Sequence, residues 1–247
     1  MKAVAIIPAR LASTRLPRKI LREICGRPML AHVYEAACGC RELADVIVAT
    51  DSQEILDFCR KNGWPARLTS AAHRSGTERI HEVAKAVGAD VYVNVQGDEP
   101  LARPEHISAL LVLMKNSEVQ VGTIKTPCAA ADVNNPNAVK VVTDGVGRAL
   151  YFSRSPIPYN RDGAGGVRYF KHLGFYAYRK AALDEFCSLP ESPLERSERL
   201  EQLRFLENGI AIYVAETPFD TIGVDTEEDL QRVEAVLRGS AIASPRK

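Results

Sequence analysis

The loop that follows the first apolar segment is rich in groups that bind phosphate. Four cationic side chains lie in it, at Arg10, Arg15, Arg18 and Lys19. Ser13 lies among them and adds a hydroxyl donor. Arginine offers a planar fork to phosphate oxygens, lysine offers a compact point charge, and consecutive loop amides can surround an anion. A nucleoside triphosphate carries about four negative charges, so this loop is typical of a site for an oligophosphate.

The glycine content of the loop excludes two common phosphate-binding motifs. A dinucleotide fold needs G-x-G-x-x-G at this turn and a P-loop needs G-x-x-x-x-G-K-[ST], and the loop contains neither. Side chains would therefore hold the phosphates together with backbone amides. The alternative is that the cations only solvate an exposed loop, which a position directly after the first strand of an α/β sheet disfavours.

Two acids far apart in the sequence could complete this site. Asp98 follows the apolar segment 91–96, and Asp225 lies just before the last predicted helix. Mg²⁺ prefers one or two carboxylates and leaves its other positions to water and substrate phosphates. Each acid alone is typical of a turn or a helix start. Together they predict a Mg²⁺ site beside the phosphate-binding loop.

The composition limits the possible partners. With 247 residues, 46% of them hydrophobic, the chain can bury a substantial core. Lys and Arg total 32 against 31 Asp and Glu, which disfavours a nucleic-acid partner and makes the positive charge local. No apolar run is long enough to cross a bilayer and no signal-peptide pattern is present, so we expect a cytoplasmic protein without a membrane partner. The six cysteines lack paired C-x-x-C spacing, which predicts inert thiols.

The elements that would position these groups alternate between strand-length apolar runs and segments with helical periodicity. Strands are predicted at 4–9, 46–50 and 91–96, and helices at 28–38, 53–62, 77–87 and 104–114. This alternation predicts an α/β fold with a Rossmann-like, mostly parallel sheet and helices on both faces. Ligands collect at the carboxyl ends of such strands, so Arg10, Asp51 and Asp98 should converge on one edge of the sheet.

The second half of the chain is less regular. Strands are predicted at 121–125, 138–142, 150–153 and 169–178, some of them antiparallel, which indicates a smaller mixed-sheet subdomain. The segment 156–167 is rich in Pro, Gly and Asp and is predicted to be a loop. A helix at 200–208, a strand at 210–214 and a final helix after Asp225 complete the chain, and the last helix opens with the capping pattern of Thr226 and Asp229.

Eight blocks of the sequence resemble, in order, those of the 3-deoxy-manno-octulosonate cytidylyltransferases, also called CMP-KDO synthetases. The resemblance extends over residues 1–237. Its blocks are IPARLASTRLPRK (7–19), HRSGTER (73–79), VNVQGDEP (93–100), NPNAVKVV (135–142), ALYFSRSPIP (149–158), KHLGFYAY (171–178), LEQLR (200–204) and GVDTEEDL (223–230). One block alone could occur by chance, whereas all eight in order are highly specific.

The resemblance implies a role for each matching position. The triphosphate of CTP would be bound by Arg10, Ser13, Arg15 and Lys19. The rest of the nucleotide pocket would be formed by Ser75, Gly76, Thr77 and Arg79. The sugar-acid pocket would be lined by Gln96, Arg154, His172, Tyr176, Glu201 and Gln202. Mg²⁺ would be held by Asp98 and Asp225, and catalysis would depend on Arg15, Lys19, Asp98 and Asp225.

The residue types alone also allow a plainer interpretation of several sugar-acid positions. His172 on a strand is more often a packed side chain than a ligand contact, and Glu201 and Gln202 on a helix are usually solvated. Tyr176, four residues after His172, should face the same side of the strand. Arg154 suits a substrate carboxylate, because a guanidinium can bind it through two parallel hydrogen bonds.

The chain departs from the family at two places. Family members commonly carry glycine before the loop lysine, where this chain has Arg18. Glycine adopts positive φ freely and arginine does not, so the change bears on the local backbone and on the direction of Lys19. The segment 156–167 is also shorter than in familiar relatives, which bears on the lid over the sugar.

The resemblance implies one nucleotidyltransferase domain over residues 1–247, of the nucleotide-diphospho-sugar transferase type. Its region at about 140–190 would bind the sugar acid and contribute to a homodimer interface. The implied reaction joins CTP and 3-deoxy-D-manno-octulosonate into CMP-KDO and pyrophosphate, for lipopolysaccharide biosynthesis. The alternatives are a modified octulosonate such as the 8-amino form, another sugar acid such as sialic acid, a sugar phosphate, or a nucleotide sensor without turnover. The two acids disfavour a sensor, and the missing glycine fingerprint disfavours a Rossmann oxidoreductase.

Overall fold

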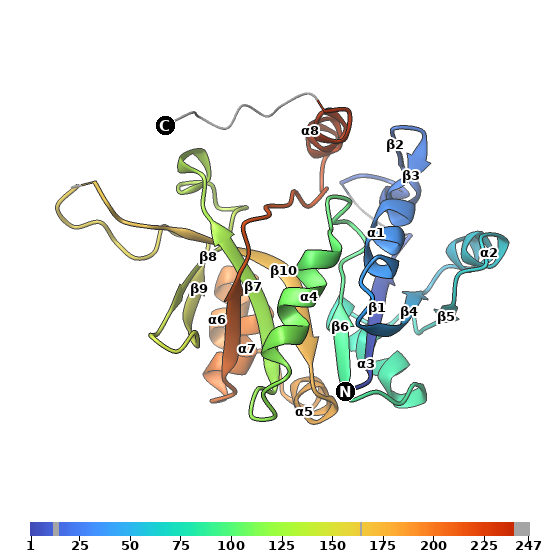
Figure 1. Ribbon diagram of the computed structural model, residues 1–247, viewed down its shortest axis with the longest axis horizontal. Helices are drawn as coiled ribbons and strands as arrows, with labels where there is room; N and C mark the ends of the chain where they lie inside the picture. The colour runs from blue at the N-terminus through green and yellow to red at the C-terminus, as the bar shows by residue number, and fades with distance from the viewer. Residues whose placement is uncertain (12–14, 164, 240–247) are drawn as a thin grey trace. The chain divides into compact units, whose positions relative to one another are not determined.

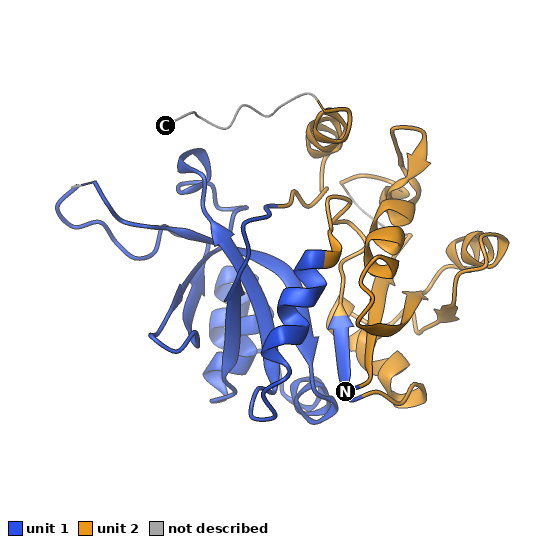
Figure 2. Cartoon of the chain, viewed as in Figure 1, with its two compact units in different colours: residues 1, 90–93, 105–220 blue, residues 2–89, 94–104, 221–247 orange. Residues whose placement is uncertain are grey.

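The computed structural model describes residues 1–11, 15–163 and 165–239, and Ser13 lies outside these ranges. The chain divides into two compact units, coloured separately in Figure 2. Unit 1 contains Met1, Asp90–Val93 and Glu105–Asp220, and unit 2 contains Lys2–Ala89, Asn94–Pro104 and Thr221–Lys247. The predicted sugar-acid and dimer region at 140–190 therefore belongs to unit 1.

Unit 2 is built on a parallel ladder of three strands. These are β1 (Ala3–Ala9), β4 (Leu43–Thr50) and β5 (Ala66–Leu68), with β4 in the middle. Every residue of β1 is buried, which explains its continuous apolar run. Helices α1 (Met29–Cys38) and α3 (Gly76–Ala86) contact both β1 and β4, and α2 (Gln53–Lys61) contacts β4 and β5. These helices confirm the predicted ones to within one residue at each end.

Two short elements of unit 2 were not predicted. A 3-10 turn, η1 (Lys19–Leu21), follows the cationic loop, and a hairpin of β2 (Glu23–Ile24) and β3 (Arg27–Pro28) follows η1. The hairpin turn has positive φ at both central residues, 52° at Cys25 and 76° at Gly26. This is the pattern of the tight turns whose twist matches that of hairpin strands. The last helix of the unit is α8 (Glu227–Leu237), which Figure 1 shows in red.

Unit 1 contains a mixed sheet. Its strand β7 (Val121–Pro127) runs parallel to β11 (Ile212–Glu216) and antiparallel to β10 (Phe170–Tyr178). Strand β10 also pairs antiparallel with β8 (Lys140–Thr143), and β8 pairs with β9 (Ala149–Ser153). Strand β6 (Val91–Asn94) neighbours β10 and ends two residues before the predicted end. The predicted mostly parallel α/β fold with a smaller mixed-sheet part is confirmed.

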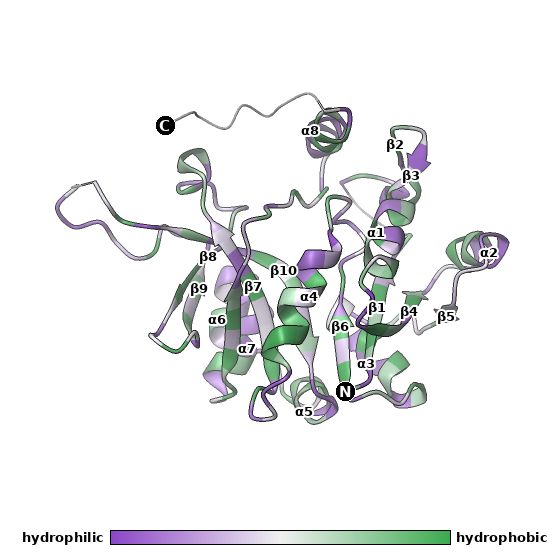
Figure 3. Cartoon of the chain, viewed as in Figure 1, coloured by the Kyte–Doolittle hydropathy of each residue, from purple (hydrophilic) through white to green (hydrophobic). Residues whose placement is uncertain are grey.

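The helices of unit 1 differ most from the sequence predictions. They are α4 (Pro104–Leu113), α5 (Lys180–Ser188), α6 (Pro193–Glu198) and α7 (Gln202–Glu207), with a 3-10 turn, η2, at Ala130–Asp132. Helix α4 is coloured mainly hydrophobic in Figure 3, with a hydrophilic first turn. The helix predicted at 200–208 begins only at Gln202, because Arg199 adopts φ 53° and ends α6 before it. Helices α5 and α6 were not predicted.

Two further expectations from the sequence concern membrane-spanning helices and the cysteines. Among the residues that the structure describes, no helix has the length and apolar character needed to span a bilayer. All six cysteines are free thiols. Helix α1 ends at Cys38 with Gly39 as its C-cap, so Cys38 and Cys40 lie at the end of a helix.

Candidate active site

The carboxyl end of β1 brings Arg10 next to Asp51 and Arg79. Ala9 of β1 pairs with Thr50 of β4, so the residues that follow them lie at the same edge, as the sequence predicted for Arg10 and Asp51. Arg79 Nη2 donates to Asp51 Oδ2 at 2.7 Å, and the Arg79 side chain is fully buried. Burial lowers the pKa of Arg79, the Asp51 carboxylate opposes this, and the nearby Arg10 lowers it further.

Two guanidinium nitrogens in this group are buried and unpaired. Within the described ranges, neither Arg10 Nη2 nor Arg79 Nε has a hydrogen-bond partner. A buried donor left without an acceptor is costly, so such donors indicate a ligand or water that accepts from them. The unpaired donors of Arg10 and Arg79 suit an anionic group of a nucleotide.

The start of α3 lies against the end of β1. Ser75 is the N-cap of α3 and accepts a hydrogen bond from a backbone N–H of its first turn, and Thr77 is buried. A Cβ at Gly76 would lie 3.3 Å from Pro8 Cγ and 3.5 Å from the side-chain amide of Gln96. Glycine therefore allows this close approach, and the structure places Gly76 of the predicted nucleotide pocket next to Gln96.

Lys19 lies between the two predicted metal-binding acids. Its Nζ donates to Asp98 Oδ2 at 2.6 Å and to Asp225 Oδ1 at 3.0 Å. The Lys19 side chain is only 12% exposed. Burial alone would lower the pKa of Lys19, but the two carboxylates outweigh burial and raise it above its ordinary value. Lys19 is thus held as a cation at neutral pH.

Arg15 extends this group on its exposed side. Arg15 Nη2 lies 2.9 Å from Asp225 Oδ2, the oxygen that Lys19 does not contact. We call Arg15, Lys19, Asp98 and Asp225 the charge cluster. Its two cations and two carboxylates come from three distant segments of the chain, and all four residues were predicted to act together in catalysis.

Close backbone packing places Asp98. A Cβ at Gly97 would lie 2.8 Å from the carbonyl oxygen of Pro8, a distance that real Cβ atoms do not adopt. Val95 N donates to Ile6 O at 3.2 Å, which joins this segment to β1. Only glycine at position 97 therefore lets the chain turn against the end of β1 and direct Asp98 toward Lys19.

A second set of bonds brings Asp225 to Asp98. Val224 N donates to the carbonyl oxygen of Asp98 at 2.9 Å. The hydroxyl of Thr221 donates to Glu99 Oε2 at 2.7 Å, and a Cβ at Gly223 would lie 3.1 Å from Glu99 Oε1. The Glu99 side chain thus lies against the segment that carries Asp225, and the two acids share a backbone connection.

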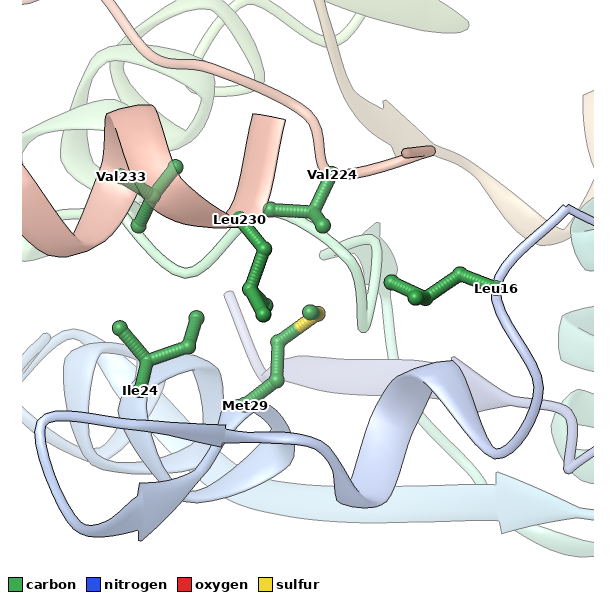
Figure 4. Packing of buried hydrophobic residues seen from close by; sticks show 6 residues of the cluster. All are labelled: Leu16, Ile24, Met29, Val224, Leu230 and Val233. Carbon is green, nitrogen blue, oxygen red and sulfur yellow. The ribbon is translucent and has the colours of Figure 1, made fainter. Parts of the chain in front are cut away.

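A hydrophobic cluster, shown in Figure 4, includes neighbours of two members of the charge cluster. Its buried members are Leu16, Ile24, Met29, Val224, Leu230 and Val233. Leu16 lies next to Arg15 in the cationic loop, and Val224 precedes Asp225. One cluster therefore joins α8 to residues next to Arg15 and Asp225, so burial of apolar surface helps to fix the segments that carry these charged groups.

Arg18 adopts the backbone conformation that glycine adopts freely. Its φ is 55° and its ψ is 31°, in the left-handed region, and its side chain forms an ion pair with Glu54. Despite the arginine, Lys19 still reaches both acids of the charge cluster. With arginine at position 18, the backbone therefore still has the left-handed conformation that suits glycine, and Lys19 still contacts Asp98 and Asp225.

The donor set of the charge cluster fits Mg²⁺. Asp98 and Asp225 converge on one cation, and hard carboxylate oxygens are the ligands that Mg²⁺ prefers. No group of three or more His, Cys, Asp or Glu suited to a metal occurs in the part of the chain that the structure describes. Water and substrate oxygens would therefore have to complete the coordination of an ion held by these two acids.

The predicted sugar-acid residues other than Gln96 belong to unit 1, and two of them lie on β10. His172 Nε2 lies within hydrogen-bond distance of Thr123 Oγ1, at 3.0 Å, and the Thr123 hydroxyl also lies 2.8 Å from Phe175 O. Burial lowers the pKa of His172 to about 3, which keeps the ring neutral. The rings of His172 and Tyr176 lie 5.4 Å apart, as expected for side chains on one face.

Tyr176 connects this face to the start of α7. Burial raises the pKa of Tyr176 well above its ordinary value, and the charges of Tyr178 and Glu201 raise it further. Gln202, which its residue type suggested would be solvated, is buried at the first position of α7. His172, Tyr176 and Glu201 thus form one polar group within unit 1, and Gln202 follows Glu201 at the start of α7.

Arg154 is largely occupied by backbone carbonyls. Its Nε donates to Glu198 O at 2.6 Å, its Nη1 to Pro136 O at 2.8 Å and its Nη2 to Arg199 O at 3.3 Å. A guanidinium has five N–H donors, so each terminal nitrogen keeps one donor without a partner among the described residues. The structure thus gives Arg154 a bracing role at the end of α6 and leaves two donors for a ligand.

Three residues that support the site were not predicted. Glu99 lies inside the block VNVQGDEP, so its position beside Asp98 was the available signal. Thr123 orients His172 through the register of β7 with β10, and Glu198 accepts from Ser153 Oγ at 2.6 Å. No motif marks Thr123 or Glu198, because their roles arise only from tertiary contacts.

Comparisons with known proteins agree with this geometry. The profile of the cytidylyltransferase family matches residues 4–212. A 3-deoxy-manno-octulosonate cytidylyltransferase from Koribacter versatilis is 74% identical over 238 residues, which cover 96% of this chain and 91% of the relative. One from Acidobacterium capsulatum is 57% identical over 237 residues, with coverage of 96% and 97%.

A solved structure of CMP:2-keto-3-deoxy-manno-octonic acid synthetase complexed with CTP is 44% identical to this chain. It superposes with a TM-score of 0.92 and covers 98% of this chain and 100% of that one. The chain therefore belongs to the cytidylyltransferase family and, within it, to the 3-deoxy-manno-octulosonate cytidylyltransferases.

Proposed function

We propose that this protein transfers the cytidylyl group of CTP to 3-deoxy-D-manno-octulosonate, as a step of lipopolysaccharide biosynthesis. The anomeric hydroxyl oxygen attacks the α-phosphorus of CTP, the bond to pyrophosphate breaks, and the hydroxyl proton is released to solvent. The products are CMP-KDO and pyrophosphate. The names of the relatives and the CTP complex of the related structure support this choice of substrates.

The convergence of the charge cluster is the observation that carries the proposal. Arg15 and Lys19 supply cations for the departing pyrophosphate, while Asp98 and Asp225 supply the carboxylates for Mg²⁺. When bound, Mg²⁺ stabilises charge on the phosphoryl oxygens and orients them for in-line displacement. Positioning and electrostatic stabilisation then suffice for transfer, and no covalent enzyme intermediate is needed.

The polar group of unit 1 suits a sugar acid. The neutral ring of His172, the un-ionised hydroxyl of Tyr176 and the carboxylate of Glu201 can bind hydroxyl groups of the sugar. The two remaining donors of Arg154 can bind the substrate carboxylate. We propose further that the protein acts in the cytoplasm as a homodimer whose interface includes part of the region 140–190, which sedimentation analysis would test.

Pyrophosphate release tests the function directly. Each nucleoside triphosphate is incubated with Mg²⁺ and one of a panel of acids: 3-deoxy-D-manno-octulosonate, its 8-amino form, and sialic acid. We expect release only with CTP and an octulosonate. Preference for the 8-amino form or for sialic acid would replace the proposed substrate. Binding of CTP without release under any condition would instead make the protein a nucleotide sensor.

A further inference from the structure

Lys19 and Arg15 together occupy three of the four carboxylate oxygens of the charge cluster. Lys19 Nζ contacts Asp98 Oδ2 at 2.6 Å and Asp225 Oδ1 at 3.0 Å, and Arg15 Nη2 lies 2.9 Å from Asp225 Oδ2. The two cations balance the two carboxylates, so the cluster has no net charge. In this arrangement the acids already have a counter-ion and offer little attraction to a divalent cation.

A metal ion and the Lys19 ammonium compete for the same oxygens. Mg²⁺ binds carboxylate oxygens at about 2.0–2.1 Å and demands near-octahedral geometry. An ion at that distance from Asp98 Oδ2 and Asp225 Oδ1 would lie close to the ammonium that contacts both atoms, and like charges at such separations repel strongly. Binding the metal through both acids therefore requires Lys19 to leave.

The structure shows how Lys19 can leave while its backbone stays in place. Its backbone is fixed in η1, where Leu21 N and Arg22 N donate to the carbonyl oxygens of Arg18 and Lys19. Its side chain has four flexible methylenes, so the ammonium can turn without a change of fold. Arg15 is 61% exposed and can move with it.

We propose that Lys19 is an internal counter-ion that closes the Asp98 and Asp225 pair to divalent metal until a triphosphate draws Lys19 and Arg15 away. The proposal rests on the function given above. A triphosphate brings about four negative charges, which compensate the two cations that leave the acids. Metal then enters with the nucleotide or after it. The same two side chains thus close the metal site in one arrangement and bind phosphate in the other.

Direct binding of Mn²⁺, followed by electron paramagnetic resonance of the free ion, tests the proposal without turnover. The variants are Lys19→Met, which removes the ammonium at similar length, and Asp98→Asn, which removes a proposed ligand. Arg22→Gln is the matched control, because Arg22 pairs with Glu227 near the start of α8 and contacts neither acid of the cluster. Each protein is titrated alone and with a non-hydrolysable CTP analogue.

We expect wild type and Arg22→Gln to bind Mn²⁺ weakly alone. Lys19→Met should bind it at least about tenfold more tightly, since one repelling charge is gone. Asp98→Asn should bind it weakly throughout. With the analogue present, wild type should bind Mn²⁺ more tightly than wild type alone, and by more than the affinity of Mn²⁺ for the analogue in solution explains. In Lys19→Met the analogue should increase Mn²⁺ affinity only slightly.

Two results would overturn the proposal in different ways. Wild type that binds Mn²⁺ equally tightly with and without the analogue contradicts the counter-ion role of Lys19 while leaving the metal site intact. Failure of wild type with the analogue to bind Mn²⁺ removes the metal from the proposed function and this inference with it. If Lys19→Met does not fold, as judged by circular dichroism, the wild-type comparison alone decides.

Discussion

At the scale of single residues, Arg18 has an unfavourable backbone conformation next to Lys19 of the charge cluster. A residue other than glycine pays about 1–2 kcal/mol in the left-handed region, where Arg18 has φ 55°. Its ion pair with Glu54 joins two exposed side chains, and such pairs contribute about 0–1 kcal/mol. The free-energy cost of the left-handed backbone therefore exceeds the stabilisation from the ion pair.

We expect Arg18→Gly to raise the free energy of unfolding by about 0.5–1 kcal/mol, because glycine adopts positive φ without strain. Arg18→Ala is the control, since alanine loses the pair and keeps the strain. Urea denaturation of both variants and wild type measures the difference. The interpretation is wrong if the glycine and alanine variants are destabilised equally.

His172 makes stability depend on pH. Its folded pKa of about 3 lies below the unfolded value of about 6.5, so between these values the unfolded chain binds a proton that the folded protein does not. Stability from the neutral ring is complete above the unfolded pKa and is lost as pH falls. The stability of wild type relative to His172→Asn should decrease by about 2 kcal/mol from pH 7 to pH 5. A difference that is constant over this range, measured by denaturation, contradicts a buried neutral ring.

At the scale of elements, the Glu99 side chain helps to position the segment between β11 and α8. Glu99 accepts from Thr221, which is 2% exposed, and lies against Gly223 two residues before Asp225. Through these contacts Glu99 is a positioning residue for Asp225. Losing it would free the start of this segment, although the bond from Val224 to Asp98 would remain.

Glu99→Ala should therefore raise the Mg²⁺ concentration needed for half-maximal activity by about tenfold, the scale of one lost hydrogen bond to a charged group. Thr221→Val should have the same effect, whereas Glu99→Gln should keep a Mg²⁺ requirement close to that of wild type. The exposed Glu185 provides the control, Glu185→Ala, which should change nothing. An equal increase in the KM for CTP and in the Mg²⁺ requirement would indicate general disruption instead.

The elements also show what the sequence could and could not predict. The strand β1 and the helices α1, α2 and α3 have strong periodicity and clear boundaries, so their prediction succeeded. The break between α6 and α7 was not predicted, because Arg199 ends α6 in a left-handed conformation that arginine rarely adopts. The hairpin of β2 and β3 was not predicted for a similar reason, because Cys25 adopts a positive φ beside Gly26.

The same division holds within the site. The sequence predicted Asp98 and Asp225 as a pair of carboxylates beside the cationic loop, and Lys19 of that loop contacts both of them. The bracing bonds of Arg154 could not be foreseen, because its acceptors at Pro136, Glu198 and Arg199 come from separate segments. Neither could the burial of Gln202, which depends on how α7 packs.

At the scale of the whole molecule, the predicted site residues separate by unit. The described nucleotide and metal residues all belong to unit 2, and those for the sugar acid belong to unit 1 except for Gln96. Each unit has its own strands and its own polar group. A substitution within one unit should therefore affect mainly the substrate that this unit binds.

Steady-state kinetics of two variants test this separation. His172→Ala should raise the KM for the sugar acid by about tenfold or more and leave CTP binding, measured by calorimetry, unchanged. Arg10→Ala should weaken CTP binding and leave the KM for the sugar acid unchanged, because the unpaired buried nitrogen of Arg10 is in unit 2. Loss of CTP affinity in His172→Ala, with normal affinity for the sugar acid, would contradict the assignment of its unit.

Leu16 shares a hydrophobic cluster with Leu230 and Val233, and this has a consequence for protein synthesis. The ribosome makes the cationic loop among the first residues and α8 among the last described ones. Until α8 has left the exit tunnel, the cluster that contains Leu16 lacks Leu230 and Val233 and has only its N-terminal members such as Ile24 and Met29. We therefore expect the cationic loop, although translated early, to be fully supported only when nearly the whole chain has emerged, so that a nascent polypeptide arrested before α8 should be inactive.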